Sequence, residues 1–292
     1  MNLNDLFASI GIDPEKVIVM RHRPFEPELN KILPWLAEEQ PDVFNAYQQT
    51  QGEKLENSMV KLIGDGYVAS FIGHESGKAL FVGIYKIDGA KPLTHEQYWK
   101  VPAYKQMQVY GMRGFQEESR ESILWFDLTP TEFYSEWKGK MIIKWPAPER
   151  SWWRRAHKND FQIHAITEES KLSASMPEWY ALDLKWDELK VLPTSWREKL
   201  SEWRGVYYIF DTQACVGYVG SAYGSLNILG RWLNYAETGH GGNKLLKNKN
   251  PEFFRFTILE RVSPDMSDQD VIAIENSWKN RLHTIEFGLN DN

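Results

Sequence analysis

Two tyrosines in neighbouring glycine-rich segments are the first candidates for chemistry in this 292-residue chain. Tyr207 belongs to GVYYIF at residues 205–210, and Tyr218 belongs to GYVGSA at residues 217–222. Both segments have the length and the β-branched and aromatic composition of strands, and a short turn separates them. Residues outside the pair decide whether the tyrosines are catalytic or belong only to a hairpin.

The sequence after the pair resembles the GIY-YIG nuclease superfamily. GVY at 205–207 corresponds to the family's GIY, and YVG at 218–220 corresponds to its YIG. The family's helical arginine matches Arg231, its metal-binding glutamate matches Glu275, and its late asparagine matches Asn290. The order and the spacing of these residues agree with the family pattern.

This resemblance covers residues 205–292, roughly a third of the chain, and implies a small α/β-sandwich domain that hydrolyses phosphodiester bonds in double-stranded DNA. It implies that Glu275 holds one Mg²⁺ (or Mn²⁺) ion that keeps most of its water. It also implies that the planar, permanently charged guanidinium of Arg231 contacts the scissile phosphate. In the family, the asparagine that corresponds to Asn290 organises the site through hydrogen bonds. We therefore expect an ordered segment around Asn290.

The family's proposed general base is a tyrosine, although an unperturbed phenol has a pKa of about 10. Tyr207 and Tyr218 are both candidates, and Tyr207 ranks slightly first. Many members have a histidine one helical turn after the arginine, but this chain has Tyr235 at that position. The subfamily that resembles the excision-repair nuclease subunit also has a tyrosine there. His240, in the TGHGGN loop, could receive the proton in place of that histidine.

Three more positions in this region are candidates for contacts with DNA. The repair subfamily has a lysine directly after YVG, where this chain has Ser221, so a phosphate contact there is left open. The glycines around His240 would let the backbone approach DNA closely. Asn243 and Lys244 follow at the end of this loop.

A cluster of arginines and tryptophans, ERSWWRRAHK at 149–158, has the composition of a nucleic-acid contact. Cationic side chains suit phosphates, and indole rings suit stacked bases. The expected contacts are Arg150, Trp152, Trp153, Arg154, Arg155 and Lys158. A smaller cluster, RHRPF at 21–25, could act in the same way. In the alternative interpretation the segment WPAPERSWW is only an aromatic loop packed over the core.

The elements that position these residues begin with short helical pieces between residues 27 and 50. Strand-like runs bounded by turn residues follow at 66–73, 79–87, 122–128, 140–145 and 161–167. Strands with little helix between them predict a small β-barrel or a curved sheet in an α+β protein. PUA-like barrels have roughly this strand content, a likeness of fold alone.

Aromatic residues are unusually frequent, with 13 Trp, 13 Tyr and 14 Phe, and most of the tryptophans precede residue 204. Such a number exceeds what a small core needs. We therefore hypothesise that the amino-terminal domain turns a base out of DNA into an aromatic pocket. The candidates for its walls are Tyr85, Trp99, Tyr104, Tyr110, Trp125 and Trp145.

We expect an amino-terminal recognition domain over residues 1–180, a linker helix at 181–203 and the nuclease-like domain at 204–292. Within the last domain, the composition predicts strands and helices in alternation. They are strands 205–211, 216–221 and 253–261, and helices 227–237 and 268–282, with a short helix ending at 248.

A net charge of -6 and an isoelectric point near 5.7 exclude a protein coated in positive charge, so DNA must be met by local basic patches. The lone Cys215 cannot form an internal disulfide and has no zinc-like spacing. A reducing cytoplasm is the expected location. No leader-like start and no long apolar run are present, so a membrane partner is not expected.

The leading interpretation is a Mg²⁺-dependent DNA endonuclease that restricts foreign or base-modified DNA in defence against phages. Cutting both strands with one catalytic centre requires a homodimer or a second encounter. One alternative is a nuclease for repair or recombination of branched DNA, which Tyr235 modestly supports. Another is a DNA-binding protein without activity, which would have no need of the full residue set.

Overall fold

The structure is a computed structural model that describes residues 1–173, 175–224 and 226–291. The chain divides into two compact units, Met1–Ser173 and Ala174–Asn292, called here the amino-terminal and carboxy-terminal units. This division falls slightly before residue 180, where the sequence predicted the first domain to end. Within the described ranges, no helix combines the length and the apolar composition that crossing a bilayer requires.

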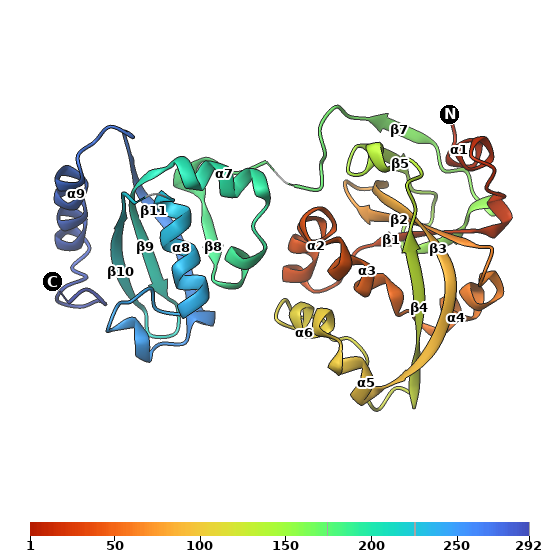
Figure 1. Ribbon diagram of the computed structural model, residues 1–292, viewed down its shortest axis with the longest axis horizontal. Helices are drawn as coiled ribbons and strands as arrows, with labels where there is room; N and C mark the ends of the chain where they lie inside the picture. Colours follow the sequence, from red (N-terminus) through yellow and green to blue (C-terminus); the bar gives the residue numbers. More distant parts are fainter. Residues whose placement is uncertain (174, 225, 292) are drawn as a thin grey trace. The chain divides into compact units, whose positions relative to one another are not determined.

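One mixed sheet forms the centre of the amino-terminal unit, with strand order β6-β1-β2-β3-β5-β7 and β4 paired to β3 (Figure 1). Its strands are β1 (Val17–His22), β2 (Tyr67–Gly73), β3 (Lys78–Thr94), β4 (Ser122–Pro130), β5 (Met141–Lys144), β6 (Trp153–Arg155) and β7 (Ile163–Ile166). The β1–β2 pair is parallel, and the other pairs are antiparallel. All five strands predicted from the sequence are present, while β1 and β6 were not predicted.

The sheet curls because register shifts interrupt the β2–β3, β3–β4 and β5–β7 ladders, and such irregularities bend strands. Its end strands, β6 and β7, are not paired with each other in the part of the chain that the structure describes. The sequence allowed a closed barrel or a curved sheet, and the structure has the curved sheet.

Both faces of β1 are covered, so all six of its residues are buried. Alternation along the strand sends Val17 and Val19 to one core and Ile18 and Met20 to the other. The helices of this unit are α1 (Leu3–Ser9), α2 (Pro27–Glu39), α3 (Pro41–Gln49), α4 (Glu53–Met59), α5 (His95–Lys100) and α6 (Pro102–Gln108). Of these, α1 contributes to the first core and α4 to the second.

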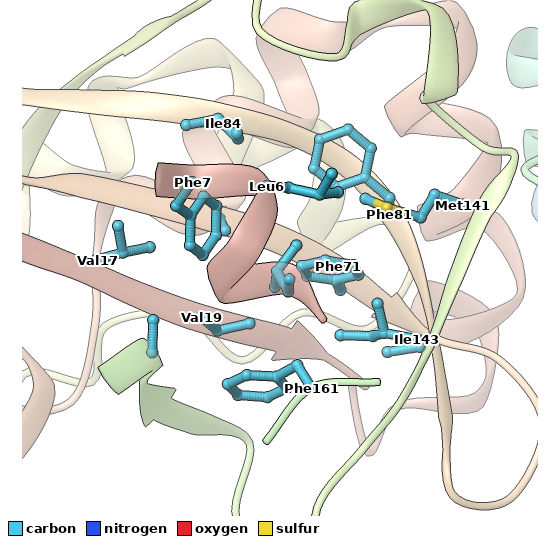
Figure 2. Packing of buried hydrophobic residues seen from close by; sticks show 14 of the residues in the cluster. Leu6, Phe7, Val17, Val19, Phe71, Phe81, Ile84, Met141, Ile143 and Phe161 are labelled. Atoms are coloured by element: carbon cyan, nitrogen blue, oxygen red, sulfur yellow. The ribbon is translucent and has the colours of Figure 1, made fainter. Parts of the chain in front are cut away.

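Figure 2 shows the first core, in which Leu6 and Phe7 of α1 lie among the rings of Phe71, Phe81 and Phe161. Each of these side chains is buried, and the four phenylalanines among them are at 0% exposure. Burying one such side chain stabilises the fold by about 1.5–3 kcal/mol. The face of the sheet that packs against α1 is therefore filled by protein side chains.

The carboxy-terminal unit is a smaller antiparallel sheet with order β10-β9-β11-β8. Its strands are β8 (Asp183–Lys185), β9 (Arg204–Asp211), β10 (Val216–Ala222) and β11 (Phe254–Val262). Its helices are α7 (Thr194–Glu202), α8 (Asn227–Thr238) and α9 (Asp268–Arg281), and both α8 and α9 pack on β9 and β10 (Figure 1). The strands and helices expected after residue 204 are all present.

Residues 181–203, expected to be a linker helix, are mostly not helical in the α form. They contain β8, the 3-10 segment Asp187–Val191 and α7. Because β8 pairs with β11, this segment belongs to the sheet of the carboxy-terminal unit.

Candidate active site

The hydroxyl group of Tyr207 is the centre of a first polar cluster. Tyr207 lies on β9, and its side chain is fully buried. Its hydroxyl oxygen lies 3.2 Å from that of Tyr235 and accepts a hydrogen bond of 3.3 Å from Nε of Arg231. Arg231 and Tyr235 are four residues apart on α8, so they share the helix face that packs on the sheet.

Tyr218 lies beside this cluster on β10. Its ring centroid is 6.5 Å from that of Tyr207 and 6.3 Å from that of Tyr235. Gly220 pairs with Tyr207 across the two strands, and a Cβ atom at Gly220 would lie 2.5 Å from the Tyr207 hydroxyl oxygen. The close approach of the ring therefore requires this glycine. Tyr218 is partly exposed, whereas Tyr207 and Tyr235 are buried.

Burial keeps the two inner phenols protonated. It raises the pKa of Tyr207 well above the ordinary value, and Tyr218 adds to the effect, while the charge of Arg231 opposes it. Burial, followed by the interactions with Tyr207 and Tyr218, raises the pKa of Tyr235. The Tyr207 hydroxyl group in turn raises the pKa of Arg231, so its exposed guanidinium stays charged.

A second polar cluster surrounds Glu275 on α9. Ser221, on β10, donates a hydrogen bond from Oγ to Oε2 of Glu275. Nζ of Lys279 lies 2.9 Å from Oε1 of Glu275, and Lys279 is only 5% exposed. Sequence reasoning missed Lys279. Its one signal, a spacing of four from a glutamate, is typical of ordinary surface pairs on helices.

The two clusters share β10. Tyr218 and Ser221 are three residues apart on this strand, and strand alternation directs side chains at odd spacing to opposite sides. The tyrosine cluster faces α8, and the Glu275 cluster faces α9. Since β10 is an edge strand of the sheet, a ligand lying along this edge could reach both clusters.

Asn290 is fixed to the same strand. Its Oδ1 accepts a hydrogen bond of 2.9 Å from the N–H of Val219, and its Nδ2 donates one of 2.8 Å to the Val219 carbonyl. The N–H of Leu289 also donates to the carbonyl of Gly217 at 2.8 Å. Asn290 is buried, at 4% exposure. The segment around it is therefore ordered, and its amide holds the backbone next to Tyr218.

The glycine-rich loop carrying His240 packs against Tyr235. A Cβ atom at Gly241 would lie 2.4 Å from Cε1 of Tyr235. Nδ1 of His240 accepts a hydrogen bond of 2.9 Å from the N–H of Gly242. Among the residues that the structure describes, no hydrogen bond joins His240 to a tyrosine hydroxyl group. The position of His240 thus comes from its own loop.

Asn243 stabilises the next turn from inside the protein. Its Oδ1 accepts hydrogen bonds from the N–H groups of Leu245 and Leu246, at 2.7 and 3.0 Å, and its Nδ2 donates to the carbonyl of Leu289 at 3.3 Å. Its neighbour Lys244 is exposed. Of these two candidates for DNA contacts, Lys244 presents its charge to solvent and Asn243 uses its amide within the fold.

The basic and aromatic cluster at 149–158 is divided by the fold. Arg154 donates to Asn159 at 2.9 Å and to two carbonyls of the preceding loop, and Trp153 packs on the second core. The structural interpretation of the segment therefore holds for these two residues. Arg150 is exposed, and Trp152 is 38% exposed. The remaining members are the half-buried Arg155 and the exposed Lys158.

The six rings expected to surround one base pocket are dispersed. Trp145 belongs to the first core and Tyr85 to the second, on the other face of the sheet. Tyr104 is buried in a parallel stack with Tyr98, with ring centroids 4.0 Å apart. These three rings fill the interior because strand alternation and helix packing turn them toward apolar neighbours.

The other three rings also lie apart from one another. Trp99 donates from Nε1 to the carbonyl of Phe115 at 3.2 Å and borders a shallow cavity. Trp125 lies on β4 beneath the ammonium of Lys91, 4.6 Å from the ring centroid. Tyr110 is buried. The expected pocket of six rings is not formed.

A metal ion at the Glu275 cluster would have few protein ligands. In the ranges that the structure describes, no group of three or more His, Cys, Asp or Glu residues is arranged around a metal position. The oxygens of Glu275 and Ser221 are hard donors, and they fit an ion that keeps most of its water, such as Mg²⁺. Because Lys279 already pairs with this carboxylate, a bound cation must share Glu275 with it or replace it.

The carboxy-terminal unit is thus a small α/β sandwich with a tyrosine–arginine cluster and a glutamate–lysine cluster on its edge strand. No protein-family model matches the chain, and no curated protein matches it significantly. Among solved structures, the catalytic domain of the homing endonuclease I-TevI matches it in two forms, one of them a mutant, at 28% and 26% identity. The matches cover 30% and 31% of this chain and 98% and 94% of those chains, each with a TM-score of 0.26. At that score the likeness adds nothing to the argument from the site's own geometry.

Proposed function

We propose that this chain is a Mg²⁺-dependent endonuclease of the GIY-YIG type that cuts double-stranded DNA with its carboxy-terminal unit. The observation that carries the proposal is the contact of Arg231 with Tyr207 beside Tyr218, on the strand that also meets Glu275 through Ser221. Four residues that match the family motif, Tyr207, Tyr218, Arg231 and Glu275, thus come from two strands and two helices and lie on β10 or on elements packed against it. A purely structural hairpin has no need of a charged arginine at a buried tyrosine.

Arg231 is the residue proposed to hold the scissile phosphate. Its Nε is bound to Tyr207, which fixes the guanidinium plane, while the side chain as a whole remains exposed. A fixed, planar cation can donate two parallel hydrogen bonds to phosphate oxygens. In this proposal Tyr207 positions Arg231 through its hydrogen bond to Nε, and Tyr235 supports Tyr207 through the contact of their hydroxyl groups.

Glu275, supported by the hydroxyl group of Ser221, is proposed to hold the metal ion. A bound Mg²⁺ ion supplies positive charge that stabilises the developing charge on the phosphate and the departing oxygen. Glu275 orients the ion through one carboxylate, and Ser221 fixes that carboxylate relative to β10. Lys279 balances the charge of Glu275 before a cation binds.

We assign proton removal from the attacking water to the phenolate form of Tyr218, which becomes the neutral phenol in this step. A general base must come within about 2.6–3.2 Å of that water. Tyr218 is partly exposed, while Tyr207 is buried, has its hydroxyl group in contact with Arg231 and Tyr235, and has a pKa raised by burial. This assignment reverses the slight preference for Tyr207 that was inferred from the sequence alone.

The biological role that we favour is restriction of foreign or base-modified DNA. The support is the separate, larger amino-terminal unit, because a small catalytic sandwich alone has too little surface to read a long sequence. A homodimer would supply the second catalytic centre for the other strand. Tyr235, which the repair-like subfamily shares, favours a second candidate, a nuclease for branched or damaged DNA.

Cleavage assays with plasmid DNA, phage DNA carrying modified cytosine and branched duplexes test this proposal, each with Mg²⁺ or EDTA. We expect Glu275→Ala to abolish Mg²⁺-dependent cleavage while DNA binding persists. Glu237→Ala, which removes an exposed carboxylate on α8 outside both clusters, is the matched control and should cut normally. Cleavage by Glu275→Ala at the wild-type rate would contradict the assignment, and a preference for branched DNA would favour the repair role.

A further inference from the structure

The amino-terminal unit contains a cavity of about 1130 Å³. It lies where the end of β1, the start of α2 and the end of α3 meet the loop segments around residues 112–120 and 149–152. The volume is slightly above the range of about 300–1,000 Å³ that small-ligand pockets usually occupy. In the described part of the chain, the six rings expected from the sequence do not contribute to its lining.

Both basic and aromatic clusters singled out in the sequence meet at this cavity. The N–H of Arg21 donates a hydrogen bond of 2.7 Å to the carbonyl of Trp152, at the end of the β1–β6 pairing. This contact places the segment 21–25 beside Arg150 and Trp152. All five residues of that segment line the cavity together with these two.

Aromatic rings form the walls at two depths. Tyr98 and Phe115 are buried and Tyr47 is half-buried, and these three rings form the inner part of the lining. Phe25 is 100% exposed and Trp152 is 38% exposed, so these two rings stand at the mouth. Covering an exposed ring with a flat apolar surface is favourable, because it removes the ring surface from water. The lining is therefore suited to a planar, partly apolar ligand.

Positive charge surrounds the same mouth. Five arginines and three glutamates line the cavity, within a chain whose net charge is -6. Arg23, Arg113 and Arg150 are exposed, and in the described ranges none of them forms an ion pair. Arg120, by contrast, is paired with Glu56 at 2.6 Å. Three available guanidinium groups are suited to an anionic ligand with several oxygens.

Arg21, which lines the cavity, has a buried donor that is not paired within the ranges that the structure describes. It is 4% exposed, its guanidinium lies 4.7 Å from the Trp145 ring centroid, and it donates one hydrogen bond to the carbonyl of Glu149. Its Nε has no hydrogen-bond partner among the residues that the structure describes. A buried, unpaired donor is unfavourable until an acceptor reaches it.

We propose that this cavity binds one nucleotide of a DNA strand, with its base among the aromatic rings and its phosphates at Arg23, Arg113 and Arg150. Phe25 then occupies the space that the base leaves in the stack, as apolar wedges do in bent DNA. The inference rests on the proposed function only for the choice of DNA as the polymer. A single strand and a duplex with one nucleotide turned out present the same base and phosphates.

The experiment uses the full chain with Glu275→Ala, so that DNA is not cut. Binding of labelled single strands, matched duplexes and duplexes with one mismatch is measured by fluorescence polarisation, and binding of dCMP and 5-methyl-dCMP by calorimetry. We expect Trp152→Ala and Arg150→Ala each to weaken binding about 10-fold, as the loss of one base stack or one phosphate contact does. Trp179→Ala and Arg197→Ala, matched substitutions in the carboxy-terminal unit, should bind normally.

Tighter binding of mismatched than of matched duplex identifies the ligand as a nucleotide turned out of the duplex, and binding of single strands alone identifies an open strand. The inference is overturned if no mononucleotide or strand binds saturably, or if the Trp152 and Arg150 variants bind as tightly as the controls while circular dichroism shows all chains folded. Intact cleavage by the wild-type chain in that case leaves the proposed function standing. Loss of binding in the cavity variants, together with no cleavage by the wild-type chain, would support the nucleotide site and contradict the proposed function.

Discussion

Nζ of Lys279 lies 2.9 Å from Oε1 of Glu275, so the carboxylate proposed to bind a metal ion has a cationic partner one turn along the same helix. In the repair subfamily that the sequence resembles, a lysine follows YVG. Here that position is Ser221, which donates to the other oxygen of Glu275. In this chain the positive charge next to the carboxylate comes from α9, and β10 contributes a hydroxyl group.

Removing this ammonium should make the folded chain more responsive to Mg²⁺. We expect Lys279→Ala to lose up to about 3 kcal/mol of unfolding free energy without metal, because a nearly buried carboxylate loses its partner. Mg²⁺ should then raise its melting temperature more than that of the wild type, since binding to the folded state stabilises it. Thermal melting across a Mg²⁺ series measures both effects. Lys279→Arg is the control, and equal shifts in all three chains would disprove competition at Glu275.

The choice between the two candidate bases predicts different kinetics for two conservative variants. Tyr218→Phe should lower kcat by about 10²–10⁴-fold, the usual contribution of a general base, with little change in DNA affinity. Tyr207→Phe removes the acceptor for Arg231 and should therefore weaken binding of the scissile phosphate as well. Single-turnover cleavage and binding assays separate these effects. A Tyr218→Phe enzyme with the wild-type rate would return the role of the base to Tyr207.

His22 predicts acid sensitivity of the amino-terminal unit. It is 4% exposed, and burial lowers its pKa to about 4 from an ordinary value near 6.5. The unfolded chain therefore binds a proton at higher pH than the folded chain, and stability present above pH 6.5 is lost as the pH falls toward 4. The loss amounts to about 3 kcal/mol. Urea unfolding at pH 7 and at pH 4.5 should show it in the wild type.

The variant His22→Gln should lack this component of the pH dependence. His157→Gln, at an exposed histidine, is the control and should behave as the wild type does. An unchanged pH dependence in His22→Gln would show that other groups cause the loss.

Substitution of two adjacent glycines distinguishes the effect of backbone strain from the effect of contact with the tyrosine cluster. Gly241 and Gly242 both have positive φ, 55° and 87°, so an alanine at either position costs about 1–2 kcal/mol of backbone energy. Only at Gly241 would the new Cβ meet Tyr235, at 2.4 Å, while the space around Gly242 is open. We expect both variants to melt earlier and only Gly241→Ala to cleave more slowly. Equal cleavage rates would mean that Tyr235 tolerates displacement.

Much of the carboxy-terminal unit could be predicted from its sequence because its signals are local. The pair of Gly/Tyr strands and the spacing of Arg231 and Tyr235 on one helix required no knowledge of distant partners. Lys279 could not be found in this way, since an i, i+4 pair with Glu275 looks the same on a buried helix face as on an exposed one. Only packing of α9 against β10 distinguishes the two cases.

The amino-terminal unit was harder to predict because its site depends on long-range pairing. The strand β1 is buried on both faces and so lacks the alternation that reveals a strand. Its partner β6 has three residues and is defined by that pairing alone. Without this pair, the clusters around Arg21 and Trp152 appear unrelated, and a ring such as Trp145 cannot be assigned to the core or to a cavity.

The hydrogen bonds of Asn290 to Val219 span 71 residues of sequence. They can therefore form only some time after the strand that carries Tyr218 has been synthesised. A ribosome completes the strand carrying Tyr218 well before Asn290 leaves the exit tunnel. At about 5–20 residues per second, the interval is on the order of several seconds. During that time the backbone beside Tyr218 lacks the amide that later holds it. A copy still being translated, or one truncated before Asn290, would therefore carry every residue of the tyrosine cluster without the two hydrogen bonds that hold the backbone of Val219.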